Sequence, residues 1–565
     1  MGNLSRRHFL KTSLALPFLA YSNRADAKNW VWNHSRSWDE KEVAKYSSWI
    51  ENIYDFKRNG TSKQKMAKIN RIFSDDEMNL LNQENFLENG NPQLSERNLN
   101  LLDSQNHCGS FPKLLFNYYS YRRGLPASIT KIKMERGGDI RYSFGNHPVK
   151  IVHSASFAGD FSDWIVKGMA GEDEGYNFVS GNFRTNPFLE DTDSVPIKIS
   201  RNFLIPGTMA YNANGHCLVV GKVDDSGEVH FLDSHPDRSI TFNQTLSALS
   251  YVNSVDSMDG DFRTAYDGFR SLRFSKIDNE GVRYFTNEEM KKFGFSVEQY
   301  LTMAEIKSLR NLGGLEINGK KVNSFPQFVR ARLQRSVEEP LSFLEIATSE
   351  LGHMFRERAS FIQEAWKDVL ENGPIVFPND SSSENIYQAN GRWEMWSSPS
   401  SDIDRKNKYN YVATRLEEMI NGFPNLSGIN YSKFNSKEEL VENLLKYKER
   451  LFDLEVLHYF SSSGKDFGLD LNDVEKRLFD LSFNPNHPPE LRWGAPENSY
   501  ERAGMKLINV PLNDGRNLNL LKSYELEKGL RFVSERQTGS TSLNPKDNPV
   551  KPPFDLIETR LKNLV

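Results

Sequence analysis

The sequence predicts an α+β protein in which a helix packs on an antiparallel sheet, followed by a mainly α-helical C-terminal region. Three observations predict it. A cysteine opens an amphipathic run near residue 108, two β-rich runs flank a turn near residue 225, and apolar residues recur at helical spacing after residue 276. A chain of 565 residues is long enough for two or three domains. The expected division is a signal segment at 1–27, a helical segment at 28–95, a cysteine domain at 96–275 and a helical region at 276–565.

The cysteine lies in the stretch Asn106-His107-Cys108-Gly109-Ser110-Phe111-Pro112. Because proline is tolerated only in the first turn of a helix, Pro112 places the start of the helix close to Cys108. Apolar residues then follow at steps of three and four until Gly124-Leu125-Pro126, which predicts a helix over residues 108–122. A thiol at a helix N-terminus lies at the positive end of the macrodipole, which favours the thiolate and makes Cys108 a candidate nucleophile.

Two β-rich runs, 215–223 and 228–233, flank the turn Asp224-Asp225-Ser226-Gly227 and predict a hairpin. If the turn is centred between Asp225 and Ser226, residue 216 faces residue 235 and residue 218 faces residue 233. In that register His216 and Asp233 lie on the same face, whereas a slip of one residue separates them. Cys108, His216 and Asp233 then supply a nucleophile, a base and an orienting carboxylate. Asp224 and Asp237 are the alternatives for the third role.

This order of Cys108, His216 and Asp233, with the cysteine opening a helix and the histidine opening a hairpin strand, resembles the papain-like superfamily in its broad sense. That superfamily includes bacterial cell-wall endopeptidases and transglutaminase-like proteins. The phrases Cys108-Gly109-Ser110-Phe111-Pro112 and Gly215-His216 are also similar to a group of exported bacterial proteins. The resemblance covers residues 95–275. It implies a papain-like catalytic domain in which Cys108 attacks an amide or ester carbonyl, with its own backbone N–H and an upstream side chain, of which Gln105 is the nearest, as oxyanion donors.

Three other interpretations of the motif stay open. The two cysteines, Cys108 and Cys217, could form a disulfide, although neighbouring residues of a strand point to opposite faces. His107, Cys108, His216 and His235 could bind a metal, although paired ligand spacings are missing. The domain could also be a catalytically inactive scaffold.

The amino terminus has the three parts of an export signal. Ser5-Arg6-Arg7-His8-Phe9-Leu10-Lys11 is basic, residues 13–20 are apolar, and Ala25-Asp26-Ala27 offers a cleavage site. The consecutive arginines resemble the twin-arginine type. The apolar run is too short to cross a bilayer, so we expect a mature chain without a membrane span in the periplasm or outside the cell.

The amino-acid composition limits the kinds of molecule that the protein is expected to bind. Lys and Arg total 71 against 75 Asp and Glu, for a net charge of −4, which gives no reason to expect nucleic-acid binding. Two cysteines and the lack of a Gly-rich phosphate loop favour an enzyme without a cofactor. We therefore expect an exported cysteine-dependent hydrolase or acyl-transferase of amide bonds, acting through a thioester on peptides of the cell wall or on proteins. The oligomeric state is left open.

Helical spacing predicts further elements outside the cysteine domain. Ser37, with Glu40 three residues later, predicts the N-cap of a helix that continues through Tyr54. In the C-terminal region the same spacing covers 303–312, 328–333, 341–370, 411–420 and 438–460, with Gly352 and Gly373 as interruptions or ends. The aromatic stretch 391–399, with Trp393 and Trp396, is interpreted either as a ligand-binding surface of the scaffold alternative or as a buried cluster.

Overall fold

The computed structural model describes residues 31–133, 147–157, 159–169, 188–211, 216–235, 238–244, 268–279, 281–378, 386–387, 391–532 and 552–565. The chain is 46% helical and 17% strand, a mixture of helix and sheet that agrees with the predicted α+β class. The predicted signal segment at 1–27 lies outside the described residues. The predicted domain boundaries stay predictions.

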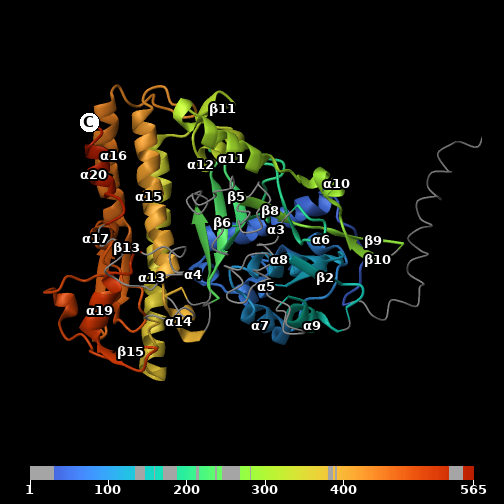
Figure 1. The fold of residues 1–565 in the computed structure, drawn as a ribbon, viewed down its shortest axis with the longest axis horizontal. Coiled ribbons are helices and arrows are strands. Elements are labelled where there is room, and N and C mark those ends of the chain that lie inside the picture. Colours follow the sequence, from blue (N-terminus) through green and yellow to red (C-terminus); the bar gives the residue numbers. More distant parts are fainter. Residues whose placement is uncertain are drawn as a thin grey trace, which may run out of the picture.

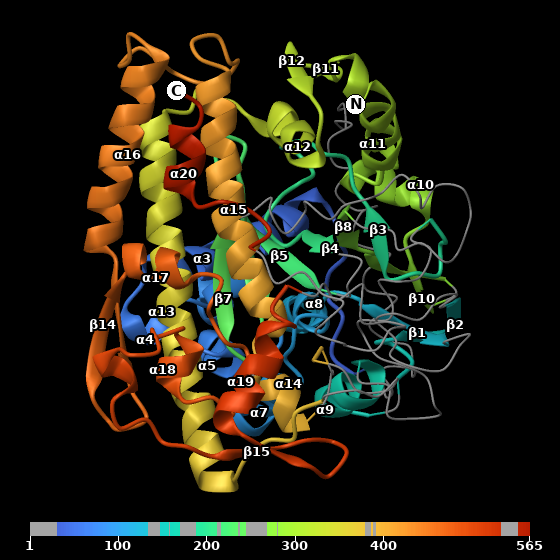
Figure 2. The ribbon, with the colours of Figure 1, turned by 60° about the vertical axis from the view of Figure 1, so that its left-hand side comes forward.

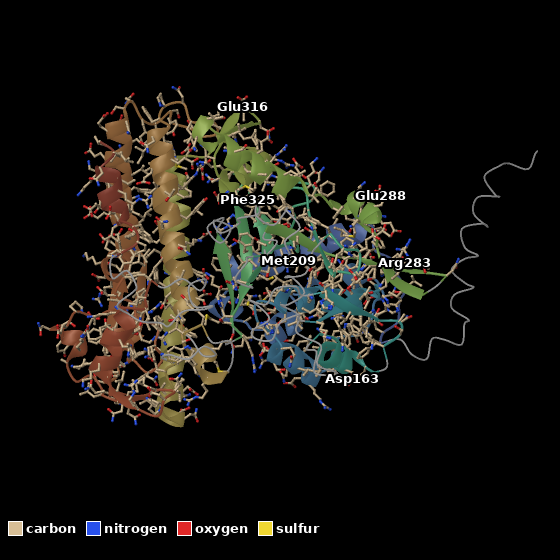
Figure 3. The ribbon with its side chains drawn as sticks, viewed as in Figure 1. Asp163, Met209, Arg283, Glu288, Glu316 and Phe325 are labelled. Atoms are coloured by element: carbon tan, nitrogen blue, oxygen red, sulfur yellow. The ribbon has the colours of Figure 1, made fainter. Side chains whose placement is uncertain are left out.

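A six-stranded antiparallel sheet lies near the middle of the molecule, between the N-terminal helices and the C-terminal helices (Figure 1). Its strand order is β3-β8-β4-β5-β6-β7, so the predicted hairpin provides β5 and β6 next to one edge. Figure 3 labels Met209 on the inner strand β4 and Arg283 on the outlying hairpin formed by β9 (Ser275–Asp278) and β10 (Gly281–Tyr284). The strands of the sheet are β3 Ser194–Pro196, β4 Met209–Tyr211, β5 Cys217–Val223, β6 Val229–Ser234, β7 Ile240–Gln244 and β8 Gly268–Leu272.

Helices α3 (Glu40–Asn59) and α8 (Phe111–Arg123) cover one face of this sheet and share its largest apolar core. The helix α3 is capped by Asp39, whose carboxylate accepts a hydrogen bond from the Glu42 N–H at 2.8 Å, so the prediction of Ser37 as the cap is wrong. The reason lies in Trp38, which is buried against α8 and keeps the chain extended up to Asp39.

The opposite face of the sheet is covered by α11 (Glu298–Leu309) and α12 (Phe325–Leu333). Apolar side chains of these helices, such as Ile306 and Phe328, form one core with Val220 and Phe231 of the hairpin. Residues up to 333 therefore pack on the same sheet as the cysteine motif.

The long helices α13 (Pro340–Asn372), α15 (Pro399–Asn421) and α16 (Lys437–Leu454) form a further layer beside the β7 edge of the sheet (Figures 1 and 2). Gly352 does not interrupt α13. The absence of a side chain at this position instead lets the Glu455 side chain pack against the helix. A Cβ there would lie 2.3 Å from the Glu455 carboxylate.

The predicted helix at 438–460 is wrong in its last six residues. Residues Val456–Phe460 form strand β13, in which exposed and buried side chains alternate. A period of two fits a strand with one buried face, and Leu457 and Tyr459 supply that face.

The aromatic stretch 391–399 lies in the C-terminal part of the chain. Trp393 lies in a core cluster of the C-terminal half, 3% exposed, and its indole N–H donates to the Ile386 carbonyl, which supports the buried-cluster interpretation of this residue. None of the helices in the described residues is both long and apolar enough to span a membrane.

The other elements are α4 Ser62–Lys65, α5 Ile69–Ser74, α6 Glu84–Leu87, α7 Glu96–Ser104, β1 Ser128–Lys133, β2 His147–His153, α9 Phe161–Asp163, β9 Ser275–Asp278, β10 Gly281–Tyr284, α10 Asn287–Met290, β11 Leu315–Ile317, β12 Lys320–Val322, α14 Gly391–Trp396, β14 Asp466–Asp470, α17 Leu471–Arg477, α18 Pro489–Arg492, β15 Asn509–Pro511, β16 Asn517–Asn519, α19 Leu520–Lys528 and α20 Ile557–Lys562.

Candidate active site

Cys108 lies in the tight turn that leads into α8. The His107 carbonyl accepts hydrogen bonds from the N–H groups of Ser110 and Phe111, at 3.0 and 2.9 Å. Ser110 is the residue before the helix, and Pro112 occupies the first turn, as the sequence predicts. The helix begins at Phe111, three residues later than predicted, so the thiol precedes the helix and lies near its positive end.

The hairpin has the predicted register at the end that carries His216. Val219 pairs with Leu232, which corresponds to residue 218 facing residue 233. Toward the turn the register shifts, because Lys222 pairs with His230 and a bulge lies between Val220 and Lys222. The turn is thus centred half a residue later than assumed, and the bulge restores the predicted pairing before the site is reached.

This register brings His216 and Asp233 into contact. Nε2 of His216 lies 3.2 Å from Oδ2 and 3.1 Å from Oδ1 of Asp233. The carboxylate is buried at the end of β6, whereas the imidazole side chain is 28% exposed. Because Nε2 faces the carboxylate, Nδ1 is the ring nitrogen left for the sulfur of Cys108.

The electrostatics of the three groups favour an ion pair between sulfur and imidazole. Burial alone would raise the pKa of the Cys108 thiol, but the charge of His216 and hydrogen bonds from His107 and His216 outweigh it and lower the pKa to about 5. Burial would lower the pKa of His216, but the charges of Asp233 and the Cys108 thiolate raise it well above 6.5. Burial likewise opposes the charged form of Asp233, yet the positive charge of His216 and its hydrogen bond keep the pKa of Asp233 below the ordinary value.

Two residues beside Cys108 have features that sequence reasoning missed. His107 was considered only as a metal ligand, whereas its side chain hydrogen-bonds to the Cys108 sulfur. Asn106 is 2% exposed, and among the described residues neither atom of its amide has a hydrogen-bond partner. The Gln105 amide, by contrast, donates to the Ser104 hydroxyl at the surface, at 3.4 Å, and no described contact joins it to Cys108.

The alternatives for the orienting carboxylate lie elsewhere. Asp224 accepts from Nε2 of His230, at 3.1 Å, at the turn end of the hairpin. Asp237 lies outside the described residues. The nearby His235 places Nε2 2.9 Å from the Thr241 hydroxyl and 3.9 Å from Asp233, so it is a neighbour of the carboxylate.

Both cysteines are free thiols in this structure. Cys217 is fully buried in the sheet core, and burial raises the pKa of its thiol. Within the part of the chain that the structure describes, no group of three or more His, Cys, Asp or Glu side chains has the arrangement of a metal site.

Comparison with known proteins adds no family to this geometry. No protein-family model, no curated protein and no solved structure matches the chain. The geometry and charges of the site are therefore the basis for assigning a function.

Proposed function

We propose that this protein is a papain-like or transglutaminase-like cysteine hydrolase or acyl-transferase that acts on amide bonds through a thioester at Cys108. The observation that supports it is the contact between His216 and Asp233, combined with the lowered pKa of the Cys108 thiol beside His216. Neighbouring groups whose pKa values are shifted in opposite directions are typical of catalytic sites. We include export by the twin-arginine route, and cell-wall peptides or proteins as substrates, in the proposal.

In the acylation step the Cys108 thiolate forms a bond to the carbonyl carbon, and the electron pair of the C=O bond moves to oxygen. When the tetrahedral intermediate collapses, the C–N bond breaks and His216 gives its proton to the leaving nitrogen, which departs as an amine. Neutral His216 then takes a proton from water or from an acceptor amine as that nucleophile attacks the thioester. The products are a carboxylic acid or a new amide, and the thiolate is restored. Asp233 orients the imidazole throughout.

The oxyanion needs hydrogen-bond donors, and we assign them to the Cys108 backbone N–H and the Asn106 side chain. Asn106 is two residues from the nucleophile, buried, and has a side-chain N–H₂ without a partner among the described residues. A buried amide left unused costs stability, so such a group is a candidate for a role in the reaction. Replacing it with Ala should lower kcat by about 100-fold or more while Cys108 still reacts with thiol reagents.

The test uses an electrophilic thiol probe and a panel of peptidoglycan stem peptides, with products followed by mass spectrometry. Wild type and Cys217→Ala should label and cleave, whereas Cys108→Ala should do neither. Cys217 is the matched control, because it is the second cysteine of the chain and lies buried in the core. Equal labelling and cleavage by Cys108→Ala would refute the proposal. Labelling without cleavage of any peptide or protein would favour the inactive scaffold.

A further inference from the structure

One carboxylate of the C-terminal half faces the catalytic end of the sheet. Asp404 belongs to α15, which is joined to the hairpin by the Tyr411 hydroxyl, a donor to Glu228 at 2.6 Å. Lys408 of the same helix donates to Glu350 of α13, also at 2.6 Å. Residues 404, 408 and 411 are spaced by four and three, so they share one face of the helix. Asp404 therefore lies on the side of α15 that faces the sheet.

The direction of α13 fixes which end of β6 Asp404 approaches. The helices α13 and α15 are antiparallel, because Glu350 pairs with Lys408 and Arg358 pairs with Asp402. On α13, Glu350 lies 3.8 Å from Nδ1 of His230 in β6. One turn later, the ring of His353 stacks on the ring of Phe242, with 4.1 Å between the two centroids. Phe242 pairs with Leu232 of β6 in the sheet.

Moving from Lys408 to Asp404 is thus a movement along β6 toward Asp233. Figures 1 and 2 both show α15 beside this edge of the sheet. The electrostatics agree with this placement. The charge of the Asp404 carboxylate interacts with His216, Asp233 and His235.

Asp404 is exposed to solvent, and no described residue forms a hydrogen bond or ion pair with its side chain. The adjacent cation, Arg405, donates instead to Asp402 at 3.0 Å, within a buried cluster that also contains Arg358. A carboxylate that no described cation pairs with directly, and that interacts electrostatically with Asp233, adds negative charge to the site.

We propose that Asp404 is a specificity-determining residue that binds a positively charged group of the substrate, an ammonium or a guanidinium, next to the bond attacked by Cys108. This inference depends on the proposed function, because it names the class of substrate for the same thiol. It also gives the C-terminal half a direct part in the site.

The experiment compares three methanethiosulfonate reagents that differ in charge: a trimethylammonium, a sulfonate and a neutral methyl reagent. Each forms a mixed disulfide with the Cys108 sulfur and releases a sulfinate, so the rate can be followed in the Cys217→Ala background. The ratio of the cationic rate to the anionic rate is the readout, since a change in thiolate reactivity alters both rates equally and cancels.

We expect wild-type Asp404 to favour the cationic reagent, and Asp404→Asn to lower the ratio by about tenfold at low salt, with Asp404→Lys inverting it. The matched control is Glu449→Gln, an exposed carboxylate of α16 without a side-chain partner among the described residues, which should leave the ratio unchanged. An unchanged ratio in Asp404→Asn, with Cys108 still reactive, would overturn this inference alone. Loss of reactivity toward all three reagents in the Asp404-intact protein would instead overturn the proposed function.

Discussion

The lowered pKa of Cys108 predicts that its reaction with a disulfide reagent persists in acid. We consider Cys217→Ala, which leaves one thiol, reacting with dithiodipyridine. At pH 6 a thiol with a pKa of about 5 is about nine-tenths thiolate, whereas a thiol at the ordinary value of 9.0 is about one-thousandth thiolate, a ratio of about 900. A thiolate of low pKa is intrinsically less nucleophilic, by about 40- to 100-fold over this difference. The net advantage of Cys108 at pH 6 is therefore about tenfold to twentyfold.

His216→Ala in the same background should remove that advantage. The imidazolium charge and its hydrogen bond both lower the pKa of the thiol, and burial, which remains, raises it. The rate at pH 6 should fall by at least about tenfold and should then rise steadily with pH. His458→Ala is the matched control, since this histidine is exposed on β13, remote from the site.

The assay is the release of pyridinethione, followed by absorbance between pH 4 and pH 9. With His216 present, the rate should be nearly flat above pH 6 and should decline as the pH falls through about 5. Where the pH rises through the elevated pKa of His216, the sulfur stays a thiolate but loses its imidazolium partner, so the rate should leave this plateau and rise. A rate that increases about tenfold with each pH unit from 5 to 8, as for an ordinary thiol, would refute the reasoning.

Three further outcomes follow from other contacts. Asp233→Asn removes the charge that raises the pKa of His216, so kcat for any amide substrate should fall by about 100-fold or more and the flat region of the labelling profile should end at lower pH, which stopped-flow labelling would reveal. Lys113→Met leaves the buried carboxylate of Asp193 without the ammonium now 2.5 Å away, so the free energy of unfolding should fall by about 3–5 kcal/mol in urea titrations; a change below about 1 kcal/mol would contradict the burial of this pair. Gly221→Ala places a Cβ 2.4 Å from the ring of Tyr54, and thermal unfolding should show a loss of about 1–3 kcal/mol, with an unchanged melting temperature as the opposing result.

The positions of Cys108, His216 and Asp233 could be predicted because each of them has a local sequence signal. Pro112 limits where the helix can begin, and the turn near Ser226 limits how the hairpin pairs. The predicted register was correct at His216 although the turn centre was not, because the bulge beside Gly221 compensates. The periodicity of apolar residues does not predict such a bulge. The agreement between the predicted and observed register at His216 therefore depended on a feature that the sequence did not reveal.

Other parts of the site lacked any local signal. Asp404 is almost two hundred residues from His216 in sequence, and only the packing of α15 on the hairpin brings it near. Tertiary packing also decided the start of α3, where burial of Trp38 moved the cap to Asp39, and the strand at 456–460, where a two-residue alternation replaced an expected helix. In each case local propensity was overridden by what the chain packs against.

The bulge at Gly221 has a consequence for engineering the hairpin. In an antiparallel ribbon, adding one residue to one arm reverses which side every later side chain occupies, whereas adding two preserves it. The strand β5, which follows His216, already contains one extra residue, and the bulge accommodates it before the strand reaches His216. A loop of different length can therefore be grafted onto the tip only if it keeps the parity of the two arms, and a single-residue deletion beside Gly221 would turn the imidazole away from its carboxylate without altering any residue of the triad.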